Sequence, residues 1–194
     1  MRPRPRPGGV ALLLAASLVL VGCGTGDDPG DTNGYVGTTG AGDVTILSPD
    51  EREPAPVLEG PDLQDEQLST ADWEGQTIVV NVWGPWCAPC REEMPALQQV
   101  WEEYQDDDVQ FVGILNRSKN ESAIAFNDKI GVTYPSFADQ GGKLELLFND
   151  SLPTVAIPTT WIIDDQGRVA ARIAIDDLTA STLAGVIDDV RAAE

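Results

Sequence analysis

Two cysteines with two residues between them are the strongest chemical feature of the sequence. Cys87 and Cys90 enclose Ala88 and Pro89, and Trp86 stands directly before them. A thiolate near ambient pH attacks a disulfide sulfur and forms a mixed disulfide, which a second thiol nearby can resolve. Two intervening residues suit a small, reversible disulfide ring. The spacing therefore predicts thiol-disulfide exchange at Cys87 and Cys90.

The segments that flank the cysteines predict where the pair lies in a fold. Residues 77–83 are β-branched and almost continuously apolar, which is typical of a buried central strand. Residues 89–104 carry apolar side chains at helical spacing, and Pro89 suits the first turn of a helix. At the start of a helix, free N–H groups and the helix dipole favour a thiolate. Thiols in such settings have pKa values of about 3.5–7.5, so we expect an acidic Cys87.

Other interpretations of the cysteine pair are weaker. A static disulfide that closes so short a ring adds little chain-entropy stabilisation. The pair could also be one half of a metal site, but such a site needs further ligands, and the chain has only one other cysteine and no histidine. The missing histidine also excludes Ser-His-Asp and Cys-His catalysis and haem attachment. We expect neither a metal nor a cofactor beyond the redox-active disulfide.

The remaining pattern predicts an α/β fold. Asp164-Asp165-Gln166-Gly167 stands between two strand-like segments and signals a hairpin. A β-α-β start that ends in β-β-α indicates a mixed central sheet flanked by helices, and we assign residues 54–194 to this domain. Further strands are expected at residues 109–115, 160–163 and 169–175, and further helices at residues 121–130, 144–148 and 179–193, the last with Thr179 as its cap.

The first 53 residues predict export and attachment to a membrane. Three arginines precede an apolar run at residues 10–21, which is shorter than the ~20 residues of a membrane-spanning helix and typical of a signal peptide. Leu20-Val21-Gly22-Cys23 resembles a bacterial lipobox, whose cysteine is lipidated. We expect residues 1–22 to be a lipoprotein signal peptide, Cys23 to hold the lipid, and residues 23–53 to form a flexible Gly/Asp-rich tether. Within the tether, residues 44–47 form either a short strand or more linker.

The net charge excludes one class of partner. The chain has 32 acidic and 12 basic side chains, and removal of residues 1–22 with their three arginines changes its formal charge from −20 to −23. Nucleic-acid binding needs the opposite sign, and anionic lipid headgroups repel such a surface. Attachment to a membrane must therefore come from the lipid at Cys23. The acidic surface is either solubilising or an adaptation to salt.

Two stretches of the sequence resemble the thioredoxin superfamily, and more closely its TlpA/ResA-like branch of exported, membrane-tethered thiol-disulfide oxidoreductases. The first is residues 73–95, which contain the cysteine pair, and the second is residues 157–167. The resemblance extends over about residues 55–194. It implies a thioredoxin-like fold with an N-terminal extension and an insert at about residues 116–137.

The resemblance also implies roles for individual residues. Cys87 matches the attacking cysteine, and Cys90 matches the resolving one. Pro158 matches the cis-proline that faces the disulfide, and Ile157 beside it offers backbone for pairing with a substrate. Trp86 either shields the thiols or is an ordinary half-buried aromatic residue.

Proton transfer needs a further candidate residue. Asn81 stands where thioredoxin itself has a buried aspartate that assists proton transfer, so another base has to serve Cys90. Glu93 lies three residues after Cys90 on the same helical face and matches the active-site glutamate of ResA-like proteins. We expect Glu93 to tune the thiol pKa and to accept the Cys90 proton. The alternative is a glutamate that only favours the helix dipole.

The leading hypothesis is a monomeric, lipid-anchored reductant of exported protein disulfides at the extracytoplasmic face of the bacterial membrane. The resemblance implies apocytochrome c or other exported thiols as substrates and a membrane thiol-reductant transporter as electron donor. One alternative is an oxidase that forms disulfides in secreted proteins, and another is a non-catalytic binding module. A peroxiredoxin would need proline and Thr or Ser where Val80 and Gly84 stand, and a copper-delivery protein would need C-x-x-x-C and histidine, so both classes are excluded.

Overall fold

The structure, a computed structural model, describes residues 35–39 and 42–193, with side chains from residue 43 onward. The predicted signal peptide, residues 1–22, and the predicted lipidation site, Cys23, lie outside the described residues and stay predictions. None of the helices within the described ranges is both long and apolar enough to cross a bilayer.

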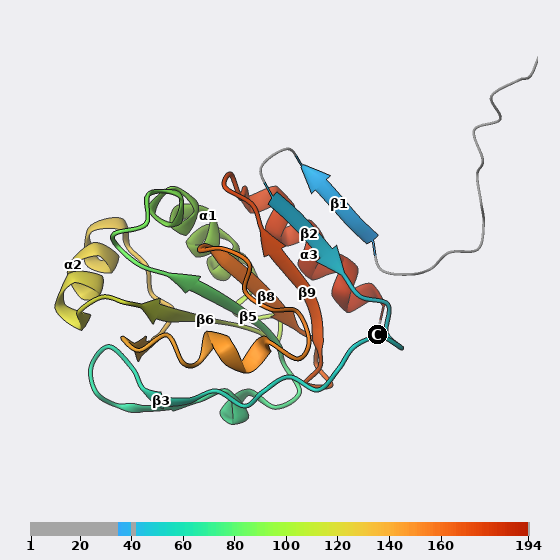
Figure 1. The fold of residues 1–194 in the computed structure, drawn as a ribbon, viewed down its shortest axis with the longest axis horizontal. Coiled ribbons are helices and arrows are strands. Elements are labelled where there is room, and N and C mark those ends of the chain that lie inside the picture. Colours follow the sequence, from blue (N-terminus) through green and yellow to red (C-terminus); the bar gives the residue numbers. More distant parts are fainter. Residues whose placement is uncertain (1–34, 40–41, 194) are drawn as a thin grey trace, which may run out of the picture. The chain divides into compact units, whose positions relative to one another are not determined.

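A seven-stranded mixed sheet forms the centre of the domain (Figure 1). Its strands are β1 (Tyr35–Thr39), β2 (Gly42–Ile46), β5 (Thr77–Trp83), β6 (Val109–Asn116), β7 (Ser136–Asp139), β8 (Thr159–Ile163) and β9 (Val169–Ala174). They lie in the order β1-β2-β9-β8-β5-β6-β7. β5, β6 and β7 are parallel, whereas β8 is antiparallel to both of its neighbours. The predicted mixed sheet is confirmed.

Three helices cover one face of the sheet, and shorter segments cover the other (Figure 1). The helices are α1 (Ala88–Tyr104), α2 (Asn120–Ile130) and α3 (Ala180–Ala192). The other face is covered by the 3-10 helices η1 (Thr70–Trp73) and η2 (Glu145–Phe148) and by the small hairpin of β3 (Glu59–Pro61) and β4 (Gln67–Ser69). One buried cluster on each side of the sheet makes up the core.

Strand β5 is buried on both faces because each cluster takes alternate side chains from it. Val79 and Trp83 pack among the helices, whereas Val80 and Val82 pack on the opposite side. This double burial is why the sequence shows a continuous apolar run there rather than an alternating pattern. It also leaves Asn81 as a polar side chain on the helix side of the core, where it contacts α1.

The elements predicted beyond residue 54 lie within a few residues of their expected bounds. Thr179, the predicted cap of α3, accepts a hydrogen bond from the backbone N–H of Thr182 at 3.2 Å. The helix expected at residues 144–148 is the short 3-10 helix η2. Strand β7 has no counterpart among the predicted elements, because four residues are too few to show a period. The predicted insert at residues 116–137 contains α2 and leads into β7.

The N-terminal segment departs from the expected tether of residues 23–53. β2 pairs with β9 along the edge of the sheet, and β1 pairs with β2. Arg172 of β9 binds the carboxylate of Asp43 at 2.6 Å. Val44 and Ile46 pack against the helix-side core. The segment is structured because β9 offers an open edge and the β-branched residues of β2 gain a hydrophobic surface to cover.

A buried ion pair fixes the chain that follows β2. Arg52 and Asp164 meet at 3.1 Å with both side chains fully buried, and Arg168 binds the same carboxylate at 2.8 Å. The backbone N–H of Val169 donates to the carbonyl of Glu53 at 2.9 Å. The expected boundary at residue 54 is therefore corrected, since the domain includes residues 35–39 and 42–53.

Candidate active site

The junction between β5 and α1 places the two cysteines. β5 ends at Trp83, and α1 begins at Ala88 with Cys87 as its N-cap and Pro89 in its first turn. Cys87 and Cys90 form a disulfide. The backbone N–H of Cys90 donates to the Cys87 sulfur at 3.2 Å. When the disulfide opens, this N–H and the helix N-terminus stabilise a thiolate at Cys87.

The two cysteines differ in accessibility. Cys87 retains 4% of its surface exposed, whereas Cys90 retains none. Of the two sulfur-bearing residues, Cys87 is therefore the one with surface open to a partner thiol or disulfide. This difference supports the attacking and resolving roles that the resemblance implies.

The loop that leads into β8 lies against Cys87. The peptide bond between Ile157 and Pro158 is cis, which agrees with the expectation for Pro158. The Ile157 carbonyl oxygen lies 3.7 Å from the Cys87 sulfur. Ile157 is half-buried, and Val155 two residues earlier is exposed. The loop thus presents backbone and apolar side chains next to the reactive sulfur.

Trp86 is held at the end of β6. Its indole N–H donates to the carbonyl oxygen of Asn116 at 2.9 Å, and 52% of the residue is exposed. Gly84 makes room for the ring, since a Cβ at this position would lie 2.5 Å from the indole nitrogen. Trp86 is therefore a fixed but exposed aromatic side chain directly before the cysteine pair.

Glu93 lies inside the protein, about one turn along α1 from Cys90. Only 2% of the residue is exposed, and Asn81 donates from Nδ2 to its Oε1 at 2.8 Å. Burial raises the pKa of Glu93 from an ordinary 4.5 to about 8, although the Asn81 hydrogen bond acts in the opposite direction. A thiol has an ordinary pKa of about 8.5, so the pKa of this carboxyl is matched to that of a thiol, as a proton carrier for Cys90 requires. Burial and a place beyond the first helical turn favour the proton-carrier interpretation over the dipole interpretation.

Comparison with known proteins identifies the family. The sequence matches the family model described as the AhpC/TSA family over residues 52–172. The chain belongs to this family. The thioredoxin-like protein YneN of Bacillus subtilis is 33% identical over 121 residues, which are 61% of this chain and 68% of the relative. The thiol-disulfide oxidoreductase ResA of Bacillus thuringiensis is 27% identical over 137 residues, which are 70% of this chain and 76% of the relative.

Solved structures similar to this AhpC/TSA protein agree with the assignment. A DsbF homologue from Corynebacterium diphtheriae has a TM-score of 0.69 and 35% identity, covering 75% of this chain and 92% of that chain. A secreted thiol-disulfide isomerase from Corynebacterium glutamicum has a TM-score of 0.67 and 30% identity, covering 76% and 90%. The predictions of a thioredoxin-like fold and of a thiol-disulfide oxidoreductase are confirmed at this level.

Two residues at the site of this AhpC/TSA protein are not marked by any sequence motif. Tyr134, between α2 and β7, is buried, and its hydroxyl has no hydrogen-bond partner among the described residues. Burial and the negative charge of Glu93 both raise the pKa of Tyr134, so the hydroxyl lies in the field of that carboxyl. Asn116 supplies the carbonyl that holds Trp86. Both interactions join segments that are distant in the chain, and no local pattern signals them.

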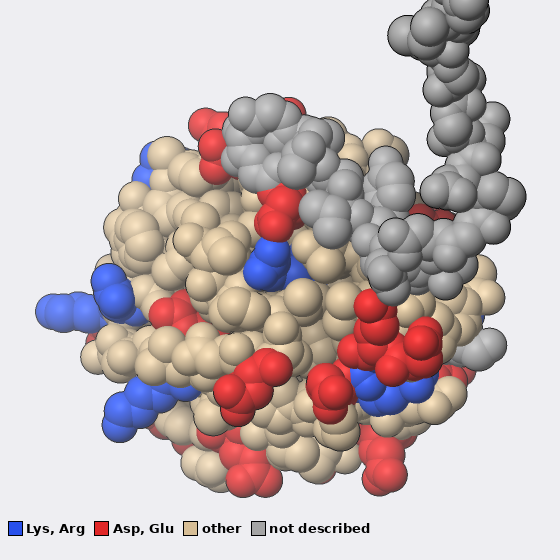
Figure 2. Space-filling model, turned by 45° about the vertical axis from the view of Figure 1, so that its right-hand side comes forward, with Lys and Arg blue, Asp and Glu red and all other residues tan. Residues whose placement is uncertain are grey.

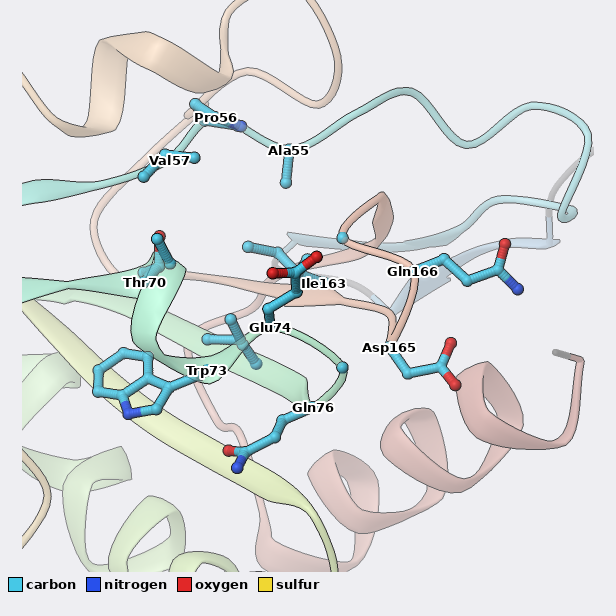
Figure 3. Close-up of a pocket in the computed structure, with 14 residues that line it drawn as sticks. Ala55, Pro56, Val57, Thr70, Trp73, Glu74, Gln76, Ile163, Asp165 and Gln166 are labelled. Atoms are coloured by element: carbon cyan, nitrogen blue, oxygen red, sulfur yellow. The ribbon is translucent and has the colours of Figure 1, made fainter.

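A cavity of about 530 Å³ lies at the other end of β5 from the cysteines (Figure 3). Trp73 and Gln76 border it before the strand begins, and Ile163, Asp165 and Gln166 border it from β8 and the following turn. No cysteine lines this cavity. The thiol chemistry of the AhpC/TSA domain and this cavity are therefore separate features of the molecule.

Proposed function

We propose that the protein is a membrane-tethered, extracytoplasmic thiol-disulfide oxidoreductase that reduces disulfides in exported proteins such as apocytochrome c. Its electrons would come from a membrane thiol-reductant transporter. The observation that carries the proposal is the Cys87–Cys90 disulfide at the start of α1 together with the buried Glu93 further along the helix. A stabilised thiolate, a resolving thiol and a proton carrier are what disulfide exchange requires.

Each of these residues has one step in the reductive direction. The Cys87 thiolate attacks a substrate disulfide, so that one substrate sulfur leaves as a thiolate and the other is bonded to Cys87. In the molecules whose Glu93 is ionised, Cys90 passes its proton to the Glu93 carboxylate and attacks the Cys87 sulfur. The second substrate thiolate leaves, and the Cys87–Cys90 disulfide forms. Two electrons have then moved to the substrate, and the electron donor must return them.

The same residues support the reverse direction. In the oxidised protein, Glu93 has a pKa of about 8 and is mainly protonated at pH 7. When a partner thiolate attacks Cys87, Cys90 leaves as a thiolate and takes the Glu93 proton. The site is chemically competent both ways, so the reduction potential decides which direction dominates.

The experiment that tests the direction is a redox titration. The purified protein is equilibrated with glutathione buffers of known potential, and its free thiols are counted. A midpoint near about −270 mV would support the reductant, and one near about −120 mV would overturn it in favour of an oxidant. In parallel, Cys87→Ser should lose all disulfide reductase activity. Activity retained in that variant would reject the catalytic assignment and favour a binding module.

Membrane attachment is proposed from the basic start of the chain, its apolar run and Cys23. Acidic side chains are spread over the face shown in Figure 2, and they would be repelled by anionic lipid headgroups. A covalent lipid therefore accounts for attachment better than surface charge does. Replacement of Cys23→Ser should move the protein from the membrane pellet to the soluble fraction and abolish fatty-acid labelling. A variant that stays in the pellet would contradict the lipid anchor.

Disulfide formation or rearrangement in secreted proteins is the second candidate function. The similarity to the Corynebacterium glutamicum protein, which is described as a secreted thiol-disulfide isomerase, favours it. Reduced and scrambled ribonuclease separates the candidates. An oxidase or isomerase restores ribonuclease activity, whereas a reductant keeps the substrate reduced.

A further inference from the structure

Asn81 joins three elements of the fold behind the disulfide. It stands in β5 directly opposite Thr160 of β8. Its Nδ2 donates to Oε1 of Glu93 at 2.8 Å and to Oγ1 of Thr160 at 3.1 Å. An amide nitrogen has two hydrogens, so both are engaged. All three residues are buried, and the amide is thereby held with one N–H toward the Glu93 carboxyl and the other toward the Thr160 hydroxyl.

This hydrogen bond helps to decide when Glu93 ionises. Burial favours the neutral carboxyl, whereas the Asn81 donor favours the charged one, so the two effects oppose each other. Without the donor, Glu93 would stay protonated to a higher pH and would lose its capacity to take the Cys90 proton. Asn81 itself does not titrate and therefore does not compete for that proton.

The other groups around this carboxyl are neutral or take part in the reaction. Tyr134 faces it from the loop before β7, but burial and the charge of Glu93 keep this phenol protonated. α1 also carries Cys90, about one turn before Glu93. β8 contributes the neutral hydroxyl of Thr160. Asn81 is therefore the neighbour whose side chain bonds the Glu93 carboxyl directly.

We propose that Asn81 is a positioning residue for the proton carrier, and that Asn81 and Glu93 form one amide–carboxyl pair whose two groups can change places. The proposal rests on the proposed thiol-disulfide exchange. The double substitution Asn81→Asp/Glu93→Gln keeps one amide and one carboxyl on the same two elements, with donor and acceptor exchanged across the 2.8 Å contact. Both replacements preserve side-chain size. The Thr160 hydroxyl can donate to a carboxylate as readily as it accepts from an amide.

The test compares the full chain with Asn81→Ala, Glu93→Gln and the double variant. Asn127→Ala, which removes another buried amide on α2, is the matched control. The rate of reduction of a small disulfide is measured from pH 5 to pH 10, and alkylation of Cys87 is measured separately so that the first step is known.

Glu93→Gln should slow the reaction at pH 7 by about a hundredfold, and the double variant should regain at least about tenfold of this loss. Asn81→Ala keeps the Glu93 carboxyl but removes the N–H that donates to it, so the pH–rate profile should shift to higher pH by about one unit. Asn127→Ala should keep the profile of the unmodified protein.

Two results would overturn the proposal that Asn81 and Glu93 form an exchangeable pair. One is a double variant as slow as Glu93→Gln, and the other is an Asn81→Ala profile that does not move. Circular dichroism and complete disulfide formation establish that the variants are folded, and Asn81→Ser replaces Asn81→Ala should that variant not fold. An inactive unmodified protein would reject the proposed function and the pair with it, whereas an active one without recovery in the double variant would reject the pair alone.

Discussion

The sulfur of Cys87 accepts a hydrogen bond from the backbone N–H of Cys90 at 3.2 Å, inside the small ring that their disulfide closes. The donor belongs to the main chain, so it is present whatever side chains stand between the cysteines. It distinguishes the two sulfurs, because Cys87 is the N-cap of α1 and Cys90 lies within the helix. The asymmetry of the reaction is thus built into the turn that starts α1.

The reduced protein should therefore have one acidic thiol. Cys87 has the helix N-terminus and a backbone donor to stabilise its thiolate, whereas Cys90 is fully buried. At pH 6, iodoacetamide should alkylate Cys87 at least about tenfold faster than Cys90. Mass spectrometry of the peptides after short labelling measures both rates. Equal labelling of the two cysteines would contradict this account.

Glu93 should make the oxidised protein less stable as the pH rises. Its folded-state pKa of about 8 is above the ordinary 4.5, so the folded state holds the proton more tightly than the unfolded state does. The contribution of Glu93 to the free energy of unfolding is complete below about pH 4.5. It falls by about 1.4 kcal/mol per pH unit as the pH rises to about 8, and then it levels off.

The neutral variant Glu93→Gln should lack this slope and be more stable than the unmodified protein at pH 9. Urea unfolding of both oxidised proteins between pH 5 and pH 9 measures the effect. Parallel stability curves would show that Glu93 ionises normally in the folded state.

Gly84→Ala should displace the ring of Trp86. A Cβ at this position would lie 2.5 Å from the indole nitrogen, so the ring must leave and lose its hydrogen bond to Asn116. A hydrogen bond of about 1 kcal/mol corresponds to roughly a fivefold rise in KM for a peptide disulfide. Tryptophan fluorescence should also move toward the solvent-exposed spectrum. The rate of Cys87 alkylation should stay the same.

Gly185→Ala is the matched control for that substitution. A Cβ at Gly185 would meet nothing within 4 Å, and the position is on the exposed side of α3. Because alanine is the better helix former, this variant should be slightly more stable and fully active. If both alanine variants changed KM equally, the contact between Gly84 and Trp86 would not be the cause.

A chain that begins at residue 54 should be much less stable than one that begins at residue 42. The shorter chain loses Arg52, which leaves the buried carboxylate of Asp164 with Arg168 as its ionic partner. Loss of one partner from a buried pair costs about 3–5 kcal/mol, and Arg168 should keep the loss near the lower figure. Urea unfolding of the two chains measures it. Equal midpoints would restore the expected boundary at residue 54.

Helices and strands can be predicted from the sequence where their burial produces a recognisable pattern of apolar residues. The continuous apolar run of β5 and the helical spacing of α1 both reflect which faces are covered. β2 could not be predicted in this way, because its few β-branched residues also occur in linkers. What makes it a strand is β9, and Arg172 there is 129 residues away from its partner Asp43. Such a pairing has no local signature.

The same division applies to the candidate active site. Cys87 and Cys90 are recognisable from their spacing alone, and Glu93 follows from its place on the helix. The burial that raises the Glu93 pKa to about 8 depends on packing that only the fold supplies. The hydrogen bond from Asn81 and the field felt by Tyr134 arise where β5, α1 and the loop before β7 meet. The type of reaction can thus be predicted from the residue types and their spacing, whereas the pKa values of the reactive groups depend on tertiary contacts.

The pairing of β2 with β9 also governs how the protein behaves toward other extended chains. All six residues of β9 are buried, and without β2 its backbone donors and acceptors would form an open template for aggregation. With β2 in place, the outer edge passes to β1, a strand of five residues with a glycine at its centre. Such a short, glycine-interrupted edge is a poor template for further strands. A protein proposed to work on partly unfolded exported chains is thereby kept from joining their strands to its own sheet.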